Sequence, residues 1–138
     1  MGWKTIIGQA RVKELLQRTI ANRQVAHAYL FVGQAGIGKD ALAIEFAKAL
    51  LCSASAAPPC DQCSNCKRMD SLQHPNLRFV CALPVGKNEQ PGDDPIAVLT
   101  AEQVEEIQEH MRQKATDPYH RIEIDRAAFI KINSVREL

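Results

Sequence analysis

Apolar residues recur along two stretches of the chain with the spacing of an α-helix. In residues 10–23 they fall at positions i, i+3, i+4 and i+8, which share one face of a 3.6-residue period. The residues of that face are Val12, Leu15, Leu16 and Ile20. In residues 39–51 the apolar stripe is wider, so the pattern predicts a second helix that packs well inside a domain.

Three short apolar runs have the composition of buried strands. Residues 27–33 contain no Asp, Glu, Lys or Arg and end in a glycine, which is typical of a strand covered on both faces in a parallel sheet. Residues 77–81 and 122–124 are shorter runs that each include one charged residue, and we predict a strand for each of them as well. A buried strand followed at once by a helix predicts an α/β domain with a parallel sheet.

Residues 84–99 separate the second predicted strand from a third helix. Proline, glycine and charged residues dominate this stretch, which predicts a solvated, flexible loop. Thr100 then stands at a helix start, and Gln103 occupies the reciprocal position of a capping box.

Composition and charge narrow the class of protein only modestly. The chain has 138 residues, 46% hydrophobic and 24% charged, which fits one ordinary globular domain. There is no run of about 18 apolar residues and no secretory signal, so we expect a cytoplasmic chain with no membrane partner. Residues 1–69 carry a net charge of +5 and residues 70–138 one of −4, an imbalance more typical of solvated surfaces than of a nucleic-acid site.

Residues 33–40 read GQAGIGKD and contain the phosphate-loop pattern G-x-x-x-x-G-K between a predicted strand and a predicted helix. Glycines let the backbone turn its N–H groups inward as an anion nest, and the positive end of the helix adds to the attraction. The lysine would reach the β and γ phosphates. The predicted nucleotide-binding residues are Gly33, Gly36, Ile37, Gly38, Lys39 and Asp40.

Asp40 stands where this pattern usually has the Ser or Thr that binds Mg²⁺, and it leaves two outcomes open. A carboxylate is itself a good ligand for a hard cation. It also places a negative charge beside a triphosphate, and such a repulsion at about 4 Å is roughly 1–4 kcal/mol. The repulsion weighs against binding of ATP and Mg²⁺, so a weakened or lost nucleotide site is the favoured interpretation.

Four of the five cysteines have the spacing of a metal site. Cys60, Cys63 and Cys66 form C-x2-C-x2-C, and Cys52 precedes them by a short stretch of small residues and prolines. Four thiolates complete the tetrahedral shell of a structural zinc ion, although an iron–sulfur cluster uses similar spacings. Zinc is the favoured interpretation, with a zinc module over residues 52–66, whereas Cys81 is interpreted as a small buried residue.

The four histidines show no spacing that indicates catalysis, and we interpret them as structural or surface residues. They are His27, His74, His110 and His120.

The order of these motifs resembles one protein family. The matching segments, besides the phosphate loop and the cysteines, are Ile7-Gly8-Gln9, residues 27–33, His74-Pro75-Asn76 and residues 132–138. Together they resemble the clamp-loader ATPases of bacterial DNA polymerase III, the delta-prime and gamma/tau subunits. Residues 84–128 fit this family only loosely and read as an insertion, and the spacer between Cys52 and Cys60 is one residue shorter than is usual in the family.

This resemblance implies that residues 1–138 are the N-terminal part of an AAA+ P-loop domain with an inserted four-cysteine zinc module. It implies that Ile7, Gly8 and Gln9 lie beside the adenine base. It also implies a role in DNA replication, in a complex that loads the sliding clamp onto primed DNA. The implied partners are the gamma/tau and delta subunits, and through the complex the clamp and DNA.

Asp40 favours the delta-prime type, which resembles a stator and often has a degenerate loop. Two alternatives stay open: an ATP-hydrolysing gamma/tau-type subunit, and an unrelated P-loop kinase or GTPase with a structural zinc site. A zinc-stabilised α/β domain of some other role is a further reading. The sequence contains no Walker B strand and no Ser-Arg-Cys arginine-finger motif, so we expect no ATPase or polymerase activity from this chain itself.

Overall fold

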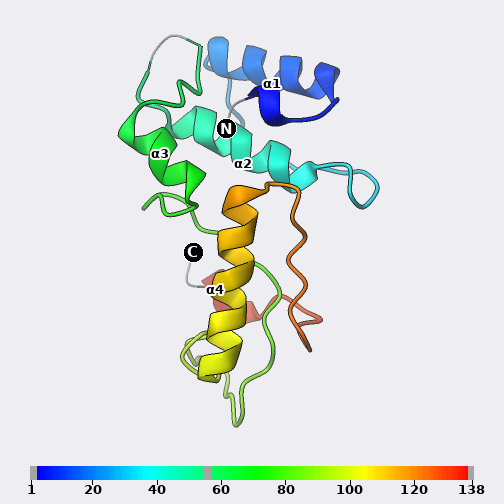
Figure 1. Cartoon of the computed structure of the whole chain (residues 1–138), viewed down its shortest axis with the longest axis vertical. Helices are drawn as coiled ribbons and strands as arrows, with labels where there is room; N and C mark the ends of the chain where they lie inside the picture. The colour runs from blue at the N-terminus through cyan, green and yellow to red at the C-terminus, as the bar shows by residue number, and fades with distance from the viewer. Residues whose placement is uncertain (1–2, 55–56, 137–138) are drawn as a thin grey trace. The chain divides into compact units, whose positions relative to one another are not determined.

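A computed structural model describes residues 3–54 and 57–136, and it divides the chain into two compact units, residues 1–77 and residues 78–138 (Figure 1). Parts of three sequence predictions lie outside the described residues: both ends of the 1–138 domain, residues 55–56 of the zinc module, and residues 137–138 of the last family segment. No helix within the described ranges is long and apolar enough to cross a bilayer.

The first unit is built around one central helix, α2 (Lys39–Leu51). Both α1 (Ala10–Ala21) and α3 (Ser64–Asp70) pack against it, and the short 3-10 helix η1 (Trp3–Thr5) precedes them (Figure 1). Because α2 has neighbours on more than one side, most of its wide apolar stripe is buried, as predicted for residues 39–51, although Leu50 is 41% exposed. The buried apolar residues of this unit are Ile6, Leu16, Ala41, Leu42, Ile44, Phe46, Ala49, Cys66 and Met69.

Helix α1 confirms the helix predicted within residues 10–23, but its predicted apolar face is only partly buried. Leu16 is 3% exposed, whereas Leu15 on the same predicted face is 63% exposed. Helix α1 therefore buries a narrower apolar stripe than the sequence pattern covers.

The second unit contains α4 (Ala101–Thr116) and the short α5 (Ile132–Arg136). The capping box at the start of α4 is present as predicted: Thr100 Oγ1 accepts from the backbone N–H of Gln103, and Gln103 Oε1 accepts from that of Thr100. In the 84–99 loop, Glu89 pairs with Lys131 at 2.9 Å. The predicted flexibility of this loop stays a prediction.

The three predicted strands are wrong for the described structure. Residues 27–33, 77–81 and 122–124 are extended or irregular, and none of them forms a ladder in the part of the chain that the structure describes. A β-strand exists only through hydrogen bonds to a neighbouring strand, and no described segment supplies that neighbour. Leu30 and Val32 are accordingly 88% and 83% exposed instead of buried. The parallel-sheet core of the predicted α/β fold is therefore absent from the described residues, whose regular structure is helical.

Candidate metal centre and phosphate loop

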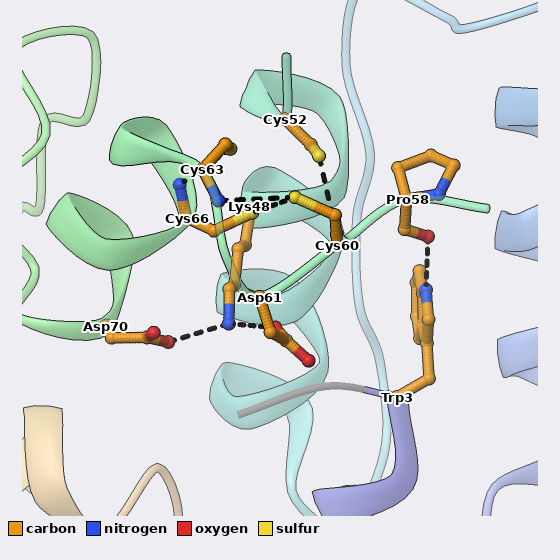
Figure 2. A network of polar contacts seen from close by, with 9 residues as sticks. All are labelled: Trp3, Lys48, Cys52, Pro58, Cys60, Asp61, Cys63, Cys66 and Asp70. Atoms are coloured by element: carbon orange, nitrogen blue, oxygen red, sulfur yellow. Dashed lines mark hydrogen bonds and ion pairs between the residues drawn. The ribbon is translucent and has the colours of Figure 1, made fainter. Parts of the chain in front are cut away.

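Four cysteines that are spread over fifteen residues meet at one point of the first unit. The Sγ atoms of Cys52, Cys60, Cys63 and Cys66 all lie within 4.8 Å of one another, and those of Cys60 and Cys66 are 4.0 Å apart (Figure 2). Among the described residues, no other group of three or more His, Cys, Asp or Glu side chains lies close enough to share a metal ion.

Local backbone structure holds each thiol in place. Cys52 is the C-cap residue of α2, and Cys63 is the N-cap residue of α3, where its sulfur accepts from the backbone N–H of Cys66 at 3.4 Å. One repeat earlier, the sulfur of Cys60 accepts from the N–H of Cys63, also at 3.4 Å. Each C-x2-C segment therefore folds as a turn in which the sulfur of its first cysteine accepts a hydrogen bond from the backbone N–H of its second cysteine.

The donor set fits a tetrahedral metal ion. Zinc–sulfur bonds of about 2.3 Å in a tetrahedron place neighbouring sulfurs about 3.8 Å apart, close to the 4.0 Å between Cys60 and Cys66. All four positions are supplied by the chain, so such a site has no open coordination position for catalysis. The structure thus brings together the four residues that the sequence singled out, while Cys81 lies outside the group.

The thiols differ in how readily they ionise. The backbone N–H groups of Gln62 and Cys63 lower the pKa of the Cys60 thiol. The Ser53 hydroxyl, together with the backbone N–H of Cys66, lowers the pKa of Cys63 to about 5. Burial instead raises the pKa of Cys66 to about 12. A bound cation would offset this burial, because a metal ion stabilises the thiolate that coordinates it.

A charged cluster beside the cysteines was missed by the sequence analysis. Lys48 of α2 is 1% exposed, and its ammonium pairs with the carboxylates of Asp61 and Asp70 (Figure 2). Burial lowers the pKa of Lys48, but the hydrogen bonds to both carboxylates outweigh it, so the pKa lies above its ordinary value. The available signal was a lysine inside the wide apolar stripe of residues 39–51.

Glu45, one turn before Lys48 on the same helix, is also buried. Its side chain is 2% exposed, and its Oε1 has no hydrogen-bond partner within the described structure. Burial raises the pKa of this carboxyl to about 7, against the opposing attraction of Lys48.

The phosphate loop has the backbone that its glycines predict. Gly36 and Gly38 have φ angles of 79° and 87°, in the left-handed region that favours glycine, and Gly38 is the N-cap of α2. The ammonium of Lys39 donates to the carbonyl oxygens of Gly33 at 2.9 Å and Gln34 at 2.7 Å. Asp40 lies in the first turn of α2, where a carboxylate also stabilises the helix dipole.

The predicted adenine-side residues lie at the start of α1. Ile7 is 77% exposed, and Gly8 and Gln9 both have positive φ angles, of 65° and 52°. Their role beside a base stays a prediction.

Two histidines in the second unit form a pair that the sequence spacing did not indicate. His110 Nδ1 and His120 Nε2 lie 2.9 Å apart, with the rings stacked. No third ligand group within the described residues joins them. The structural or surface role of these histidines stays a prediction.

Comparisons with known proteins identify relatives. The chain is 44% identical to the DNA polymerase III subunit delta' of Bacillus subtilis over 72 residues, which are 52% of this chain and 22% of that protein. It is 38% identical to the subunit tau of B. subtilis over 66 residues, 47% of this chain and 12% of that protein. It is 36% identical to the subunit tau of Escherichia coli over 89 residues, 64% of this chain and 14% of that protein.

The chain thus spans less than a quarter of the length of these relatives. No solved structure matches it significantly. The family described as "DNA polymerase III, delta subunit" matches residues 8–138, nearly the whole chain. The chain therefore belongs to the DNA polymerase III delta-subunit family.

Proposed function

We propose that this chain acts in DNA replication in the cytoplasm, as a delta-prime-type subunit of the complex that loads the sliding clamp onto primed DNA. In this proposal it is a stator that does not hydrolyse ATP, within an AAA+ P-loop domain. Its partners are the gamma/tau and delta subunits, with the clamp and primed DNA reached through the complex.

One observation carries the choice of a stator. Asp40 follows a complete G-x-x-x-x-G-K sequence and replaces the hydroxyl that would hold Mg²⁺. Phosphoryl transfer depends on metal and positive charge around the γ-phosphate, and the carboxylate of Asp40 would add negative charge there. The identity of 44% to a delta' subunit supports the same choice.

The four cysteines are proposed to hold a structural zinc ion. Cytosolic thiols stay reduced, and a four-sulfur tetrahedral site is typical of structural zinc. Binding of the ion would fasten the end of α2 to the start of α3, since Cys52 is the C-cap residue of α2 and Cys66 lies in the first turn of α3.

The second candidate, an ATP-hydrolysing gamma/tau-type subunit, is supported by the identities of 38% and 36% to tau subunits and by the intact glycines and lysine of the loop. In that case Asp40 would serve as a Mg²⁺ ligand.

Reconstitution separates these functions. The chain is mixed with purified gamma/tau and delta subunits of the same organism and separated by size exclusion, with gamma/tau and delta alone as the control. We expect the chain to co-elute with its partners and to add no ATPase activity of its own. Failure to co-elute would contradict the clamp-loader role. Magnesium-dependent ATP hydrolysis by the chain that disappears in Lys39→Ala would favour the gamma/tau type.

A further inference from the structure

Three charged residues lie close in sequence to three of the four cysteines. Lys48 precedes Cys52 by four residues, and Asp70 follows Cys66 by four residues. A separation of four residues is about one helical turn, so Cys66 and Asp70 share a face of α3. Lys48 lies about one turn before Cys52, the C-cap residue of α2. Asp61 directly follows Cys60. We call Lys48, Asp61 and Asp70 the lysine–aspartate cluster.

This cluster joins the same segments as the cysteines. Lys48 comes from α2, Asp61 from the loop before α3, and Asp70 from the last residue of α3. The ammonium of Lys48 donates to Asp61 and, at 2.7 Å, to Asp70 (Figure 2). The loop and α3 are therefore fastened to α2 without any metal, at points next to three of the four ligands.

The burial of Lys48 makes its pairing with Asp61 and Asp70 important for the packing of α2. Its side chain is 1% exposed, whereas Asp61 and Asp70 are 41% and 33% exposed. A buried ammonium is retained only when it is paired, because removing a charge from water is costly. The packing of α2 against the loop and α3 therefore depends on both carboxylates being in place, which fixes where Cys60 and Cys66 lie.

Simple charge compensation does not explain the cluster. Four thiolates around one Zn²⁺ carry a net negative charge, and in the cluster two carboxylates outnumber one ammonium. A net negative group does not neutralise a net negative site. Its contribution to the metal site is therefore geometric.

We propose that Lys48 is a positioning residue for the metal site: by pairing with Asp61 and Asp70 it assembles the cysteine-bearing segments before the metal binds. The inference rests on the proposed zinc site. In the metal-free protein the segments already lie together, so less ordering remains to be done when zinc binds. Groups that position metal ligands from outside the coordination shell typically change metal affinity about 10–100-fold when removed.

The test measures zinc affinity by competition with a chromophoric chelator. Lys48→Met removes the ammonium and keeps an unbranched side chain, and Lys67→Met is the matched control because Lys67 is exposed on α3. We expect Lys48→Met to weaken zinc binding at least about tenfold and Lys67→Met to leave it unchanged within about twofold. The Co²⁺-loaded Lys48→Met protein should keep the absorption of a tetrahedral four-thiolate site, since its ligands are intact.

A second readout follows the metal-free state. Amide resonances of residues 60–70 should stay dispersed in wild-type protein after zinc is removed, and should collapse in metal-free Lys48→Met while those of α1 persist. If Lys48→Met fails to fold, Asp70→Asn decides, because it weakens one pair at a partly exposed position. Zinc affinity equal to wild type in the folded variant would overturn the inference. Wild-type protein that binds no zinc would instead overturn the proposed metal site.

Discussion

Trp3 donates its indole N–H to the carbonyl oxygen of Pro58, with Nε1 and O 3.0 Å apart (Figure 2). This bond connects η1 to the loop that leads to Cys60, across 55 positions of sequence. The N-terminal segment therefore contributes to holding the loop between Cys52 and Cys60.

Replacement of this donor tests the connection. Trp3→Phe keeps an aromatic ring and removes the N–H, and a net hydrogen bond is worth about 0.5–1.5 kcal/mol. We expect the free energy of unfolding to fall by about 1 kcal/mol. Urea titration followed by circular dichroism measures this change, because the substitution removes the one tryptophan of the sequence and with it the fluorescence signal. Leu30→Ala, at a side chain that is 88% exposed, should leave stability within about 0.5 kcal/mol of wild type. Equal stability of Trp3→Phe and wild type would show that the bond contributes nothing.

The metal site predicts a stoichiometry. Protein purified without chelator should contain close to one zinc ion per chain by elemental analysis, because the four sulfurs form one closed site. Cys66→Ser removes the most buried ligand, and zinc content and helicity should both fall. Cys81→Ser is the control and should retain zinc, since Cys81 lies outside the group. Iron in place of zinc, or no metal in both the wild-type protein and Cys81→Ser, would contradict the prediction.

The buried carboxyl of Glu45 predicts a pH dependence of stability. Its pKa is raised from 4.5 to about 7, so folding favours the protonated form. Its stabilising contribution is complete below the unfolded pKa and is lost as pH rises through the folded one. Glu45→Gln stays neutral, so the two proteins should be equally stable well below pH 4.5, and the variant should be more stable by up to about 3 kcal/mol near pH 8.

Urea unfolding of both proteins between these pH values measures the difference in their free energies of unfolding. Ionisation of the cysteines does not affect this difference, because both proteins contain the same cysteines. A constant difference across the range would mean that Glu45 ionises as it does in the unfolded chain.

Local features of this fold could be predicted from the sequence. The helix over residues 39–51, the capping of α4 by Thr100 and Gln103, and the convergence of the cysteines depend on residues close together in the chain. For such features the period of apolar positions, the capping chemistry and the ligand spacing act over one or two turns.

Features that depend on distant partners were not predictable. The run 27–33 has the composition of a strand, but a strand needs a neighbour, and no described segment pairs with it. The pairing of Lys48 with Asp70 spans 22 positions, and no local pattern indicates which carboxylate a buried lysine will meet. The pair of His110 and His120 was also not predicted, because it depends on how the chain turns back after the end of α4.

Asp40 offers the sharpest test of the phosphate loop. Asp40→Thr completes the G-x-x-x-x-G-K-T pattern, returns a hydroxyl as a Mg²⁺ ligand and removes one negative charge beside the phosphates. If repulsion by Asp40 blocks binding, the substitution should gain roughly 1–4 kcal/mol, or about five- to a thousandfold in magnesium-dependent nucleotide affinity. Calorimetric titration of both proteins with ATP, with and without Mg²⁺, measures this gain.

The control for this gain is Lys39→Ala in the Asp40→Thr background, which should abolish it because this substitution removes the ammonium that is predicted to contact the phosphates. The Asp40→Thr substitution also removes a favourable charge from the first turn of α2, so stability should fall by about 0.3–1 kcal/mol. Wild-type protein that already binds ATP with Mg²⁺, and loses affinity in Asp40→Thr, would identify Asp40 as a working metal ligand and contradict the stator.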